Sequence, residues 1–185
     1  MKLPAIEKGW TLFLDRDGVI NEELPGDYVR RIEDFTFTTG AEAAIAALSE
    51  TFSRTIIVTN QRGVGKGLMS VADLESVHQY MRQGIEQAGG RIDQIYYCTD
   101  LDNSSENRKP QTGMAMSAKA DFPEIDFNKS VMIGNTLSDM QFGRSIGAFT
   151  IFIPSTKPEL AAAPHPLIDA VFDHLKAAAE ALTGC

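Results

Sequence analysis

The stretch WTLFLDRDGVIN, residues 10–21, joins an apolar run to two aspartates and a glycine. The run 11–14 has the composition of a buried β-strand, and Asp15 and Asp17 follow it at once. Residues two apart on a strand point the same way, and Gly18 allows a sharp turn just beyond them. The two carboxylates can therefore share one site at the carboxyl edge of a parallel sheet, where such folds bind ligands. Asp also ends many strands, so the DxDG pattern alone leaves a purely structural role open.

Apolar runs alternate with helical stretches along the chain, and this rhythm predicts an α/β fold built on a parallel sheet. Strands are expected at residues 11–14, 55–59, 94–98, 131–133 and 149–153. Helices are expected at residues 41–52, 70–88 and 169–182. The second helix opens with a Ser70-x-x-Asp73 capping pattern, and its apolar residues recur at helical spacing. Such stripes predict helices that pack on the sheet.

Composition and charge favour a compact cytoplasmic enzyme. With 185 residues, 43% of them hydrophobic and 23% charged, the chain is long enough for one domain with a substantial core, so we expect a single domain over 1–185. No apolar stretch approaches the ~20 residues that span a bilayer, and residues 1–10 lack the apolar centre of a signal peptide. A net charge of -8 argues against a nucleic-acid partner. Cys98 and Cys185 provide no disulfide framework.

Further polar side chains cluster around the ends of the later apolar runs or in the loops between them. These residues are Thr59, Asn60, Gln61, Arg108, Lys109, Asn135 and Asp139. Because the carboxyl ends of parallel strands meet at one edge of a sheet, we expect these side chains to lie near Asp15. Arg62 and Lys66 fall in the same set of loops and, with Arg108 and Lys109, would offset the negative charge of the aspartates.

The order of these motifs resembles the haloacid dehalogenase (HAD) superfamily of phosphohydrolases, which carries a DxD pair, a Thr or Ser, a Lys and an acidic motif in this sequence. The spellings DRDGVIN, DYV, TNQRGVGKG, YYC, RKPQTGM and SDM are similar to the branch that contains heptose bisphosphate phosphatases and histidinol-phosphate phosphatases. The resemblance covers most of the chain and weakens in the loop before Arg108 and after about Pro154. It implies a Rossmann-like parallel sheet with helices on both faces.

The resemblance also implies a role for each motif residue. Asp15 is the expected nucleophile, which forms an aspartyl-phosphate, and Asp17 is the expected general acid and base. Thr59 and the backbone N–H of Asn60 are expected to hold phosphoryl oxygens, and Lys109 to balance charge. Substrate binding is expected from Asn60, Gln61, Arg62 and Arg108. A magnesium site is expected from Asp15, Asp17, Asn135 and Asp139.

Many relatives in this superfamily insert a separate cap domain, for which this chain lacks room. Residues 21–39 supply only a loop or hairpin, and residues 61–108 are used by one helix, one strand and their loops. We therefore expect a minimal cap or none, and a pocket walled by loops. GVGKG, residues 63–67, does not fit the spacing of a phosphate-binding loop and is expected to be a flexible substrate loop.

Two departures from the branch concern its metals. Asn135 stands where the relatives closest in spelling usually have Asp, and Asp139 one helical turn later can supply the missing charge directly or through water. The branch usually carries a structural zinc loop with a Cys and a His after the third strand and a Cys-x-Cys before the Arg-Lys-Pro. Here Cys98 remains, Asp100 stands in place of the His, and no Cys comes shortly before Arg108. A closed zinc site needs four such ligands, so no zinc is expected.

The leading hypothesis is a magnesium-dependent phosphatase for a small phosphorylated metabolite, with a heptose bisphosphate favoured and histidinol phosphate as the alternative. A noncatalytic phosphate-binding or regulatory protein is the alternative from a different class, motivated by Asn135 and the missing zinc ligands. The protein is expected to be a monomer or a weak oligomer. His78, His165 and His174 are expected to lie at the surface or partly packed, apart from every motif, with no Ser-His-Asp arrangement.

Overall fold

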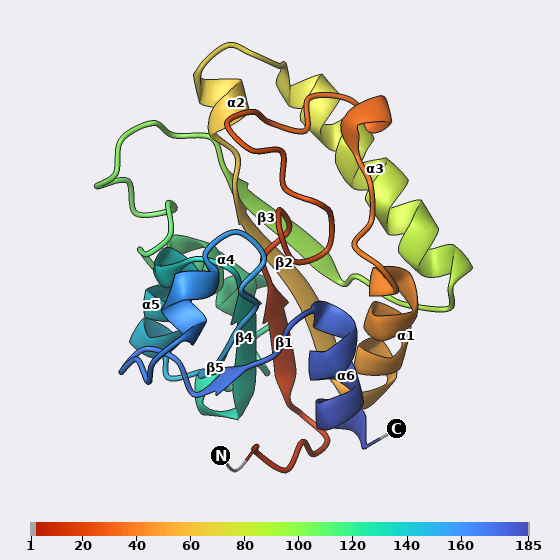
Figure 1. Cartoon of the computed structure of the whole chain (residues 1–185), viewed down its shortest axis with the longest axis vertical. Coiled ribbons are helices and arrows are strands. Elements are labelled where there is room, and N and C mark those ends of the chain that lie inside the picture. The colour runs from red at the N-terminus through yellow and green to blue at the C-terminus, as the bar shows by residue number, and fades with distance from the viewer. Residues whose placement is uncertain (1–2, 185) are drawn as a thin grey trace.

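In a computed structural model, which describes residues 3–184, six parallel strands form one sheet in the order β3-β2-β1-β4-β5-β6 (Figure 1). The strands are β1 Thr11–Leu14, β2 Arg54–Asn60, β3 Gln94–Cys98, β4 Ser130–Gly134, β5 Phe149–Phe152 and β6 Ala170–Val171. The helices are α1 Ala41–Thr51, α2 Arg62–Gly65, α3 Val71–Gln87, α4 Gly113–Asp121, α5 Leu137–Ile146 and α6 Leu175–Thr183. Three 3-10 turns are η1 Ile32–Asp34, η2 Phe127–Lys129 and η3 Pro158–Ala161.

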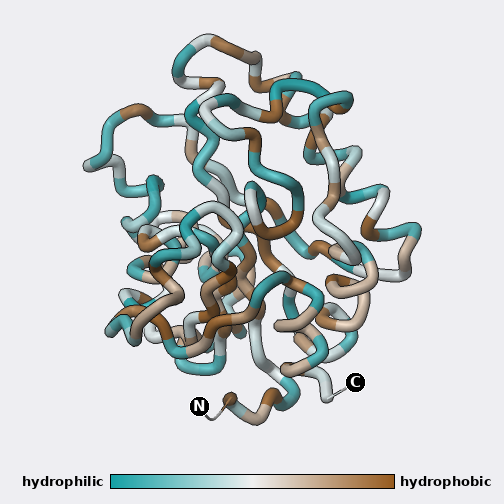
Figure 2. The backbone as a smooth tube through the Cα atoms, in the orientation of Figure 1, coloured by the Kyte–Doolittle hydropathy of each residue, from teal (hydrophilic) through white to brown (hydrophobic). Residues whose placement is uncertain are grey.

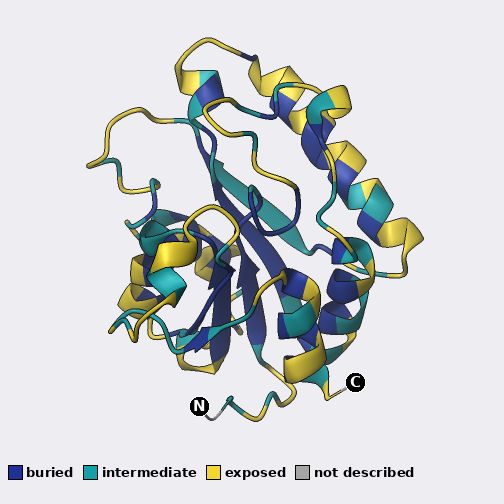
Figure 3. Ribbon diagram, in the orientation of Figure 1, coloured by how far each residue is buried: buried dark blue, intermediate teal, exposed yellow. Residues whose placement is uncertain are grey.

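Helices cover both faces of the sheet because the strand residues alternate between two apolar cores. Leu12 and Leu14 of β1 belong to the core under α1, α3 and α6. Phe13 lies between them in sequence and belongs to the core under α4 and α5. This is the period of two that a strand imposes. Figure 1 shows the two sets of helices on opposite sides of the sheet, and Figure 3 shows β1, β2 and β4 buried between them, while β3 is of intermediate burial.

The periphery is more polar than this centre. Hydrophilic stretches dominate the loops around the outside of the molecule (Figure 2). Of the helices within residues 3–184, none has the length and apolarity needed to cross a membrane. Between β1 and α1 the chain forms only η1 and isolated bridges that join Asn21 to Asp17 and to Phe37. Loops therefore form the walls above the carboxyl edge of the sheet.

The strands expected from the sequence are confirmed within one residue at each end, and the helix expected at 41–52 ends at Thr51. The Ser70–Asp73 capping box at the start of α3 is confirmed by reciprocal hydrogen bonds. The helix expected at 169–182 is wrong for residues 169–174. Residues 170–171 instead form β6 on the free edge of β5, and α6 begins only at Leu175. The Asp169 carboxylate holds this turn because it accepts a hydrogen bond from the Thr150 backbone N–H at 2.9 Å.

Candidate active site

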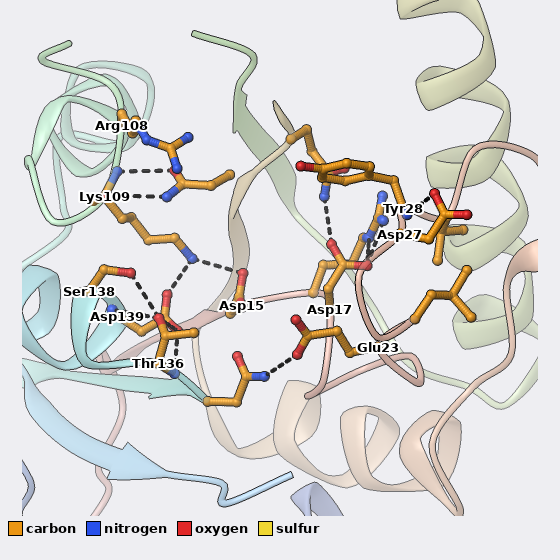
Figure 4. Close-up of a pocket in the computed structure, with 16 residues that line it drawn as sticks. Asp15, Asp17, Glu23, Asp27, Tyr28, Arg108, Lys109, Thr136, Ser138 and Asp139 are labelled. Carbon is orange, nitrogen blue, oxygen red and sulfur yellow. Dashed lines mark hydrogen bonds and ion pairs between the residues drawn. The ribbon is translucent and has the colours of Figure 1, made fainter. Parts of the chain in front are cut away.

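The site lies where the strand order of the sheet reverses. The chain proceeds from β1 through β2 to β3 on one side, and β4, β5 and β6 follow on the other side of β1. Asp15 leaves β1 and Asn135 leaves β4, and these two strands are direct neighbours. A crevice at such a switch point is where open parallel sheets bind ligands. A cavity of about 230 Å³ occupies it, lined by Asp15, Asp17, Asn135 and residues from the surrounding loops (Figure 4).

Lys109 forms the centre of the charged cluster in this cavity. Its Nζ donates to Asp15 Oδ1 at 2.8 Å and to the Val58 carbonyl at 2.7 Å, and it pairs with Asp139 Oδ1 at 2.6 Å. Burial, with the charge of Asp139 next, raises the pKa of Asp15 to about 7 against the opposing charge of Lys109. Burial alone would lower the pKa of Lys109, but the charges of Asp139 and Asp15 raise it. The cluster thus holds a protonated ammonium against a buried carboxyl group of raised proton affinity.

Asp139 uses its second oxygen to start helix α5. Its Oδ2 accepts hydrogen bonds from the Thr136 backbone N–H at 2.9 Å and from Thr136 Oγ1 at 2.6 Å, and Thr136 returns a bond in a capping box. Both carboxylate oxygens of Asp139 are therefore engaged, one with Lys109 and one with the helix terminus. Asp139 fixes the position of the ammonium group relative to β4.

Asp17 is held on three sides. Its Oδ1 accepts from Arg16 Nη2 at 2.7 Å and from Asn21 Nδ2 at 3.0 Å, and its Oδ2 accepts from Gln61 Nε2 at 2.8 Å. Burial would raise the pKa of Asp17, but the charge of Arg16 and these hydrogen bonds together lower it. The pKa of Asp15 is thus raised and that of Asp17 lowered, and such a difference between two neighbouring carboxyl groups suits different chemical roles.

Sequence reasoning missed the support behind Asp17. Arg16 is fully buried, and its Nη1 lies 3.3 Å from Nε2 of His78 on α3. The expectation that every histidine lies apart from the motifs is wrong for His78, which is buried beside the DxD pair. Burial, followed by the charge of Arg16, lowers the pKa of His78 to about 3. The signal in the sequence was its position four residues after Leu74, on the apolar stripe of α3.

The residues expected to hold phosphate at the end of β2 contact neighbouring protein groups. Asn60 exchanges two hydrogen bonds, each 3.1 Å, with the backbone of Lys109. Gln61 bridges Asp17 to Thr59 Oγ1, which it contacts at 2.9 Å. Asn60 and Gln61 line the cavity, whereas Thr59 is buried and is not among the lining residues within the described chain. These three side chains position Lys109 and Asp17.

Of the four expected basic residues, Arg108 and Lys109 line the cavity, whereas Arg62 and Lys66 are not among its lining residues within the described chain. Arg62 donates to the Leu101 carbonyl at 3.0 Å and to Asn103 Oδ1 at 2.9 Å. Arg108 donates to the same Asn103 oxygen at 3.3 Å. These bonds organise the loop after β3. The first part of the flexible loop expected at 63–67 instead belongs to helix α2, Arg62–Gly65.

Asn135 presents an oxygen without a partner. Its Nδ2 donates to Glu23 Oε2 at 3.0 Å, while its Oδ1 is buried and accepts no hydrogen bond from any described residue. Across residues 3–184, no three His, Cys, Asp or Glu side chains converge as a metal site by themselves. A divalent cation here would therefore need the Asn135 amide oxygen and backbone or water oxygens beside the Asp15 carboxylate. That donor set suits magnesium, which keeps several waters and binds through one or two carboxylates.

Three kinds of comparison relate this chain to known proteins. Residues 106–178 match the family model described as HAD-hydrolase-like. The D-glycero-alpha-D-manno-heptose-1,7-bisphosphate 7-phosphatase of Mycobacterium tuberculosis is 35% identical over 140 residues, which cover 75% of this chain and 74% of that protein. The D-glycero-beta-D-manno-heptose-1,7-bisphosphate 7-phosphatase of Vibrio cholerae is 34% identical over 173 residues, which cover 89% and 91%. The crystal structure of D,D-heptose 1,7-bisphosphate phosphatase from B. bronchiseptica, complexed with magnesium and phosphate, matches with a TM-score of 0.86 at 28% identity, over 95% of this chain and 98% of that one.

Proposed function

The chain belongs to the haloacid dehalogenase superfamily of phosphatases, and on that premise we propose that it is a magnesium-dependent phosphomonoesterase for a small sugar phosphate, with a heptose bisphosphate as the favoured substrate. The observation that carries the proposal is the buried Asp15 carboxyl, whose Oδ1 lies 2.8 Å from Lys109 Nζ. Asp17, the second carboxyl of the pair, follows two residues later in the sequence. A heptose bisphosphate is favoured because the relatives are named for that substrate. Their similarity to this chain extends over three quarters of it or more.

In the proposed mechanism Asp15 attacks phosphorus and the bond to the leaving oxygen breaks. Lys109 favours the ionised form of Asp15 that this attack needs, because its ammonium lies against the carboxylate. Asp15, the Asp17 backbone carbonyl and Asn135 would hold magnesium, which supplies positive charge beside the phosphoryl oxygens. Both oxygens of Asp139 already have protein partners, so Asp139 would contribute through water.

Asp17 performs the proton transfers in this proposal. It protonates the leaving alkoxide, then takes a proton from the water that attacks phosphorus and breaks the Asp15–phosphoryl bond. The lowered pKa keeps the free carboxyl ionised, which is the form that can accept a proton. A dianionic phosphoryl group nearby raises the pKa of Asp17 and so favours the protonated form that the first step requires. Arg16 and Gln61 hold the two Asp17 oxygens in place through both steps.

The size of the cavity limits how much substrate it encloses. Sites for drug-sized ligands commonly have ~300–1,000 Å³, and this one has about 230 Å³. We assign the phosphoryl group and its nearest atoms to the cavity, near Asn60 and Gln61, and the far end of the substrate to Arg108 at its rim. Arg62 and Arg108 organise the loop after β3 by hydrogen bonds, so the proposed enzyme requires no zinc there.

The test is phosphate release with magnesium across heptose bisphosphates, other sugar phosphates, histidinol phosphate and nucleotides. The wild type should release phosphate, fastest from a heptose bisphosphate, and Asp15→Asn should not. Asp126→Asn is the matched control, because Asp126 precedes β4 at the opposite edge of the sheet. Turnover retained in Asp15→Asn would remove the nucleophile assignment. Silence of the wild type across the panel, with thermal stabilisation by a ligand, would favour the noncatalytic phosphate-binding alternative.

A further inference from the structure

The amide of Asn135 has one possible orientation. Its Nδ2 faces Glu23 Oε2 at 3.0 Å, and it also lies 3.2 Å from Ser155 Oγ and 3.3 Å from Thr156 Oγ1. A carboxylate only accepts hydrogen bonds, so the atom that faces Glu23 must be the nitrogen. Glu23 therefore determines that the buried Oδ1 is the atom left free for a ligand.

Glu23 also differs from the other acidic residues of the cavity in its charge environment. Five acidic side chains line it, and four of them pair with a cation: Asp15 and Asp139 with Lys109, Asp17 with Arg16, and Asp27 with Arg30. Among the described ion pairs, Glu23 has none, and its hydrogen bond to the neutral Asn135 leaves its charge uncompensated. Figure 4 shows Glu23 among the residues that line the cavity. Its negative charge is thus available to an incoming cation.

We propose that Glu23 and Asn135 act as one unit in the cation site, in which Asn135 supplies the ligand oxygen and Glu23 supplies the negative charge. Glu23 is a positioning residue for the amide and reaches the cation itself directly or through a water molecule. The unit has the net charge of a single acidic ligand at position 135. This inference rests on the proposed function, because it takes magnesium as the cation.

The pairing also explains why an amide suits position 135. A carboxylate at this position would lie against the Glu23 carboxylate at hydrogen-bonding distance, with no proton between them. Like charges at such a distance repel each other strongly. The two positions are therefore interdependent, although they are separated by 112 residues in the sequence. The charge should be movable from one position to the other without loss of the site.

The experiment is a titration of the metal-free protein with magnesium chloride, followed by calorimetry and by the magnesium-dependent rise in Tm. Glu23→Gln should weaken magnesium affinity roughly 10- to 100-fold, as the loss of residues that orient metal ligands typically does. The double variant Glu23→Gln, Asn135→Asp moves the charge and should recover affinity to within about threefold of the wild type, a small effect on that scale. Glu22→Gln is the matched control, an exposed neighbour outside the cavity lining.

Magnesium affinity of Glu23→Gln equal to that of the wild type would overturn the inference, as would a double variant no better than Glu23→Gln. Tm in chelator verifies that each variant is folded. Phosphate release by the wild type, measured in parallel, separates this inference from the proposed function. If the wild type is active and Glu23→Gln binds magnesium as tightly as the wild type, only the inference is refuted. If the wild type is inactive, the proposed function is refuted.

Discussion

Nη1 of Arg16 lies 3.3 Å from Nε2 of His78, so two side chains 62 positions apart in the sequence meet behind Asp17, the proposed general acid and base. The remaining nitrogens of the guanidinium face Asp17, with Nη2 at 2.7 Å and Nε at 3.3 Å from Oδ1. His78 thus fixes the plane of the guanidinium, and the guanidinium fixes one oxygen of Asp17. Because Arg16 donates, the His78 proton must lie on Nδ1.

The first prediction concerns the geometry that Arg16 imposes. Arg16→Lys keeps the positive charge but cannot form the two-nitrogen contact with Asp17. A misplaced acid and base should lower kcat on the order of 100-fold, with a much smaller change in KM. Steady-state kinetics at saturating magnesium measure both parameters. Arg144→Lys, at the exposed ion pair with Asp169, is the control, and a wild-type kcat in Arg16→Lys would disprove the role.

The second prediction concerns acid stability. The pKa of His78 is about 3 in the folded protein and ordinarily 6.5, so between these pH values the unfolded chain binds more protons. Stability from the neutral ring is complete above pH 6.5 and is lost as pH falls, by at most about 1.4 kcal/mol per pH unit. His78→Gln should therefore make the decline in unfolding free energy from pH 6 to pH 4 shallower. Urea unfolding measures it. His165→Gln is the control, and an unchanged slope in His78→Gln would contradict the prediction.

The third prediction applies to Asp15 in the metal-free protein. Burial, with the charge of Asp139 next, raises the pKa of Asp15 from 3.8 to about 7. A carboxyl with a raised folded pKa ionises more readily in the unfolded chain, so it costs stability as pH rises from 3.8, and the full cost is reached above about pH 7. Asp15→Asn should exceed the wild type in stability at pH 8 in chelator, and the difference should shrink toward pH 5. A less stable variant at pH 8 would contradict this.

The fourth prediction separates backbone strain from a clash at Gly18. Its φ is +79°, and a Cβ there would lie 2.1 Å from Asn135 Nδ2. Gly26 has a similar φ of +74° with no atom within 4 Å of its Cβ position. Gly26→Ala should therefore report the strain alone, roughly 1 kcal/mol. Gly18→Ala should cost more in unfolding free energy and should also weaken magnesium binding, because Asn135 must move. Equal costs in the two variants would show that the clash is relieved without consequence.

The sequence predicts the fold and the central residues of the site for a simple physical reason. Apolar runs that alternate with helices form a parallel sheet, and parallel strands bring their carboxyl ends to one edge. The cavity therefore brings together Asp15, Asn135 and the polar residues near the end of β2, whatever the exact conformation of the loops. The resemblance to the family predicts Lys109 at the site, and its bonds to Asp15 and the Val58 carbonyl hold it there.

The rest of the site depends on how separate elements pack, which local patterns do not encode. His78 reaches Arg16 only because α3 lies over the turn after β1, and Glu23 meets Asn135 only because that turn lies against the loop after β4. Thr59 lies one residue before the end of β2, and Gln61 bridges it to Asp17. The short strand β6 forms by pairing with the edge of β5. That edge exists only in the assembled sheet, so a local sequence pattern does not reveal the strand.

The most direct test of the account is to find the phosphoryl group on the enzyme during turnover. A reaction with a heptose bisphosphate and magnesium, quenched in acid within the first turnovers, can be digested and analysed by mass spectrometry for a peptide that carries one added phosphoryl group. The phosphoryl group should be found on Asp15 in the wild type and should be absent from Asp15→Asn. A phosphoryl group on any other residue, or steady turnover in Asp15→Asn, would contradict it.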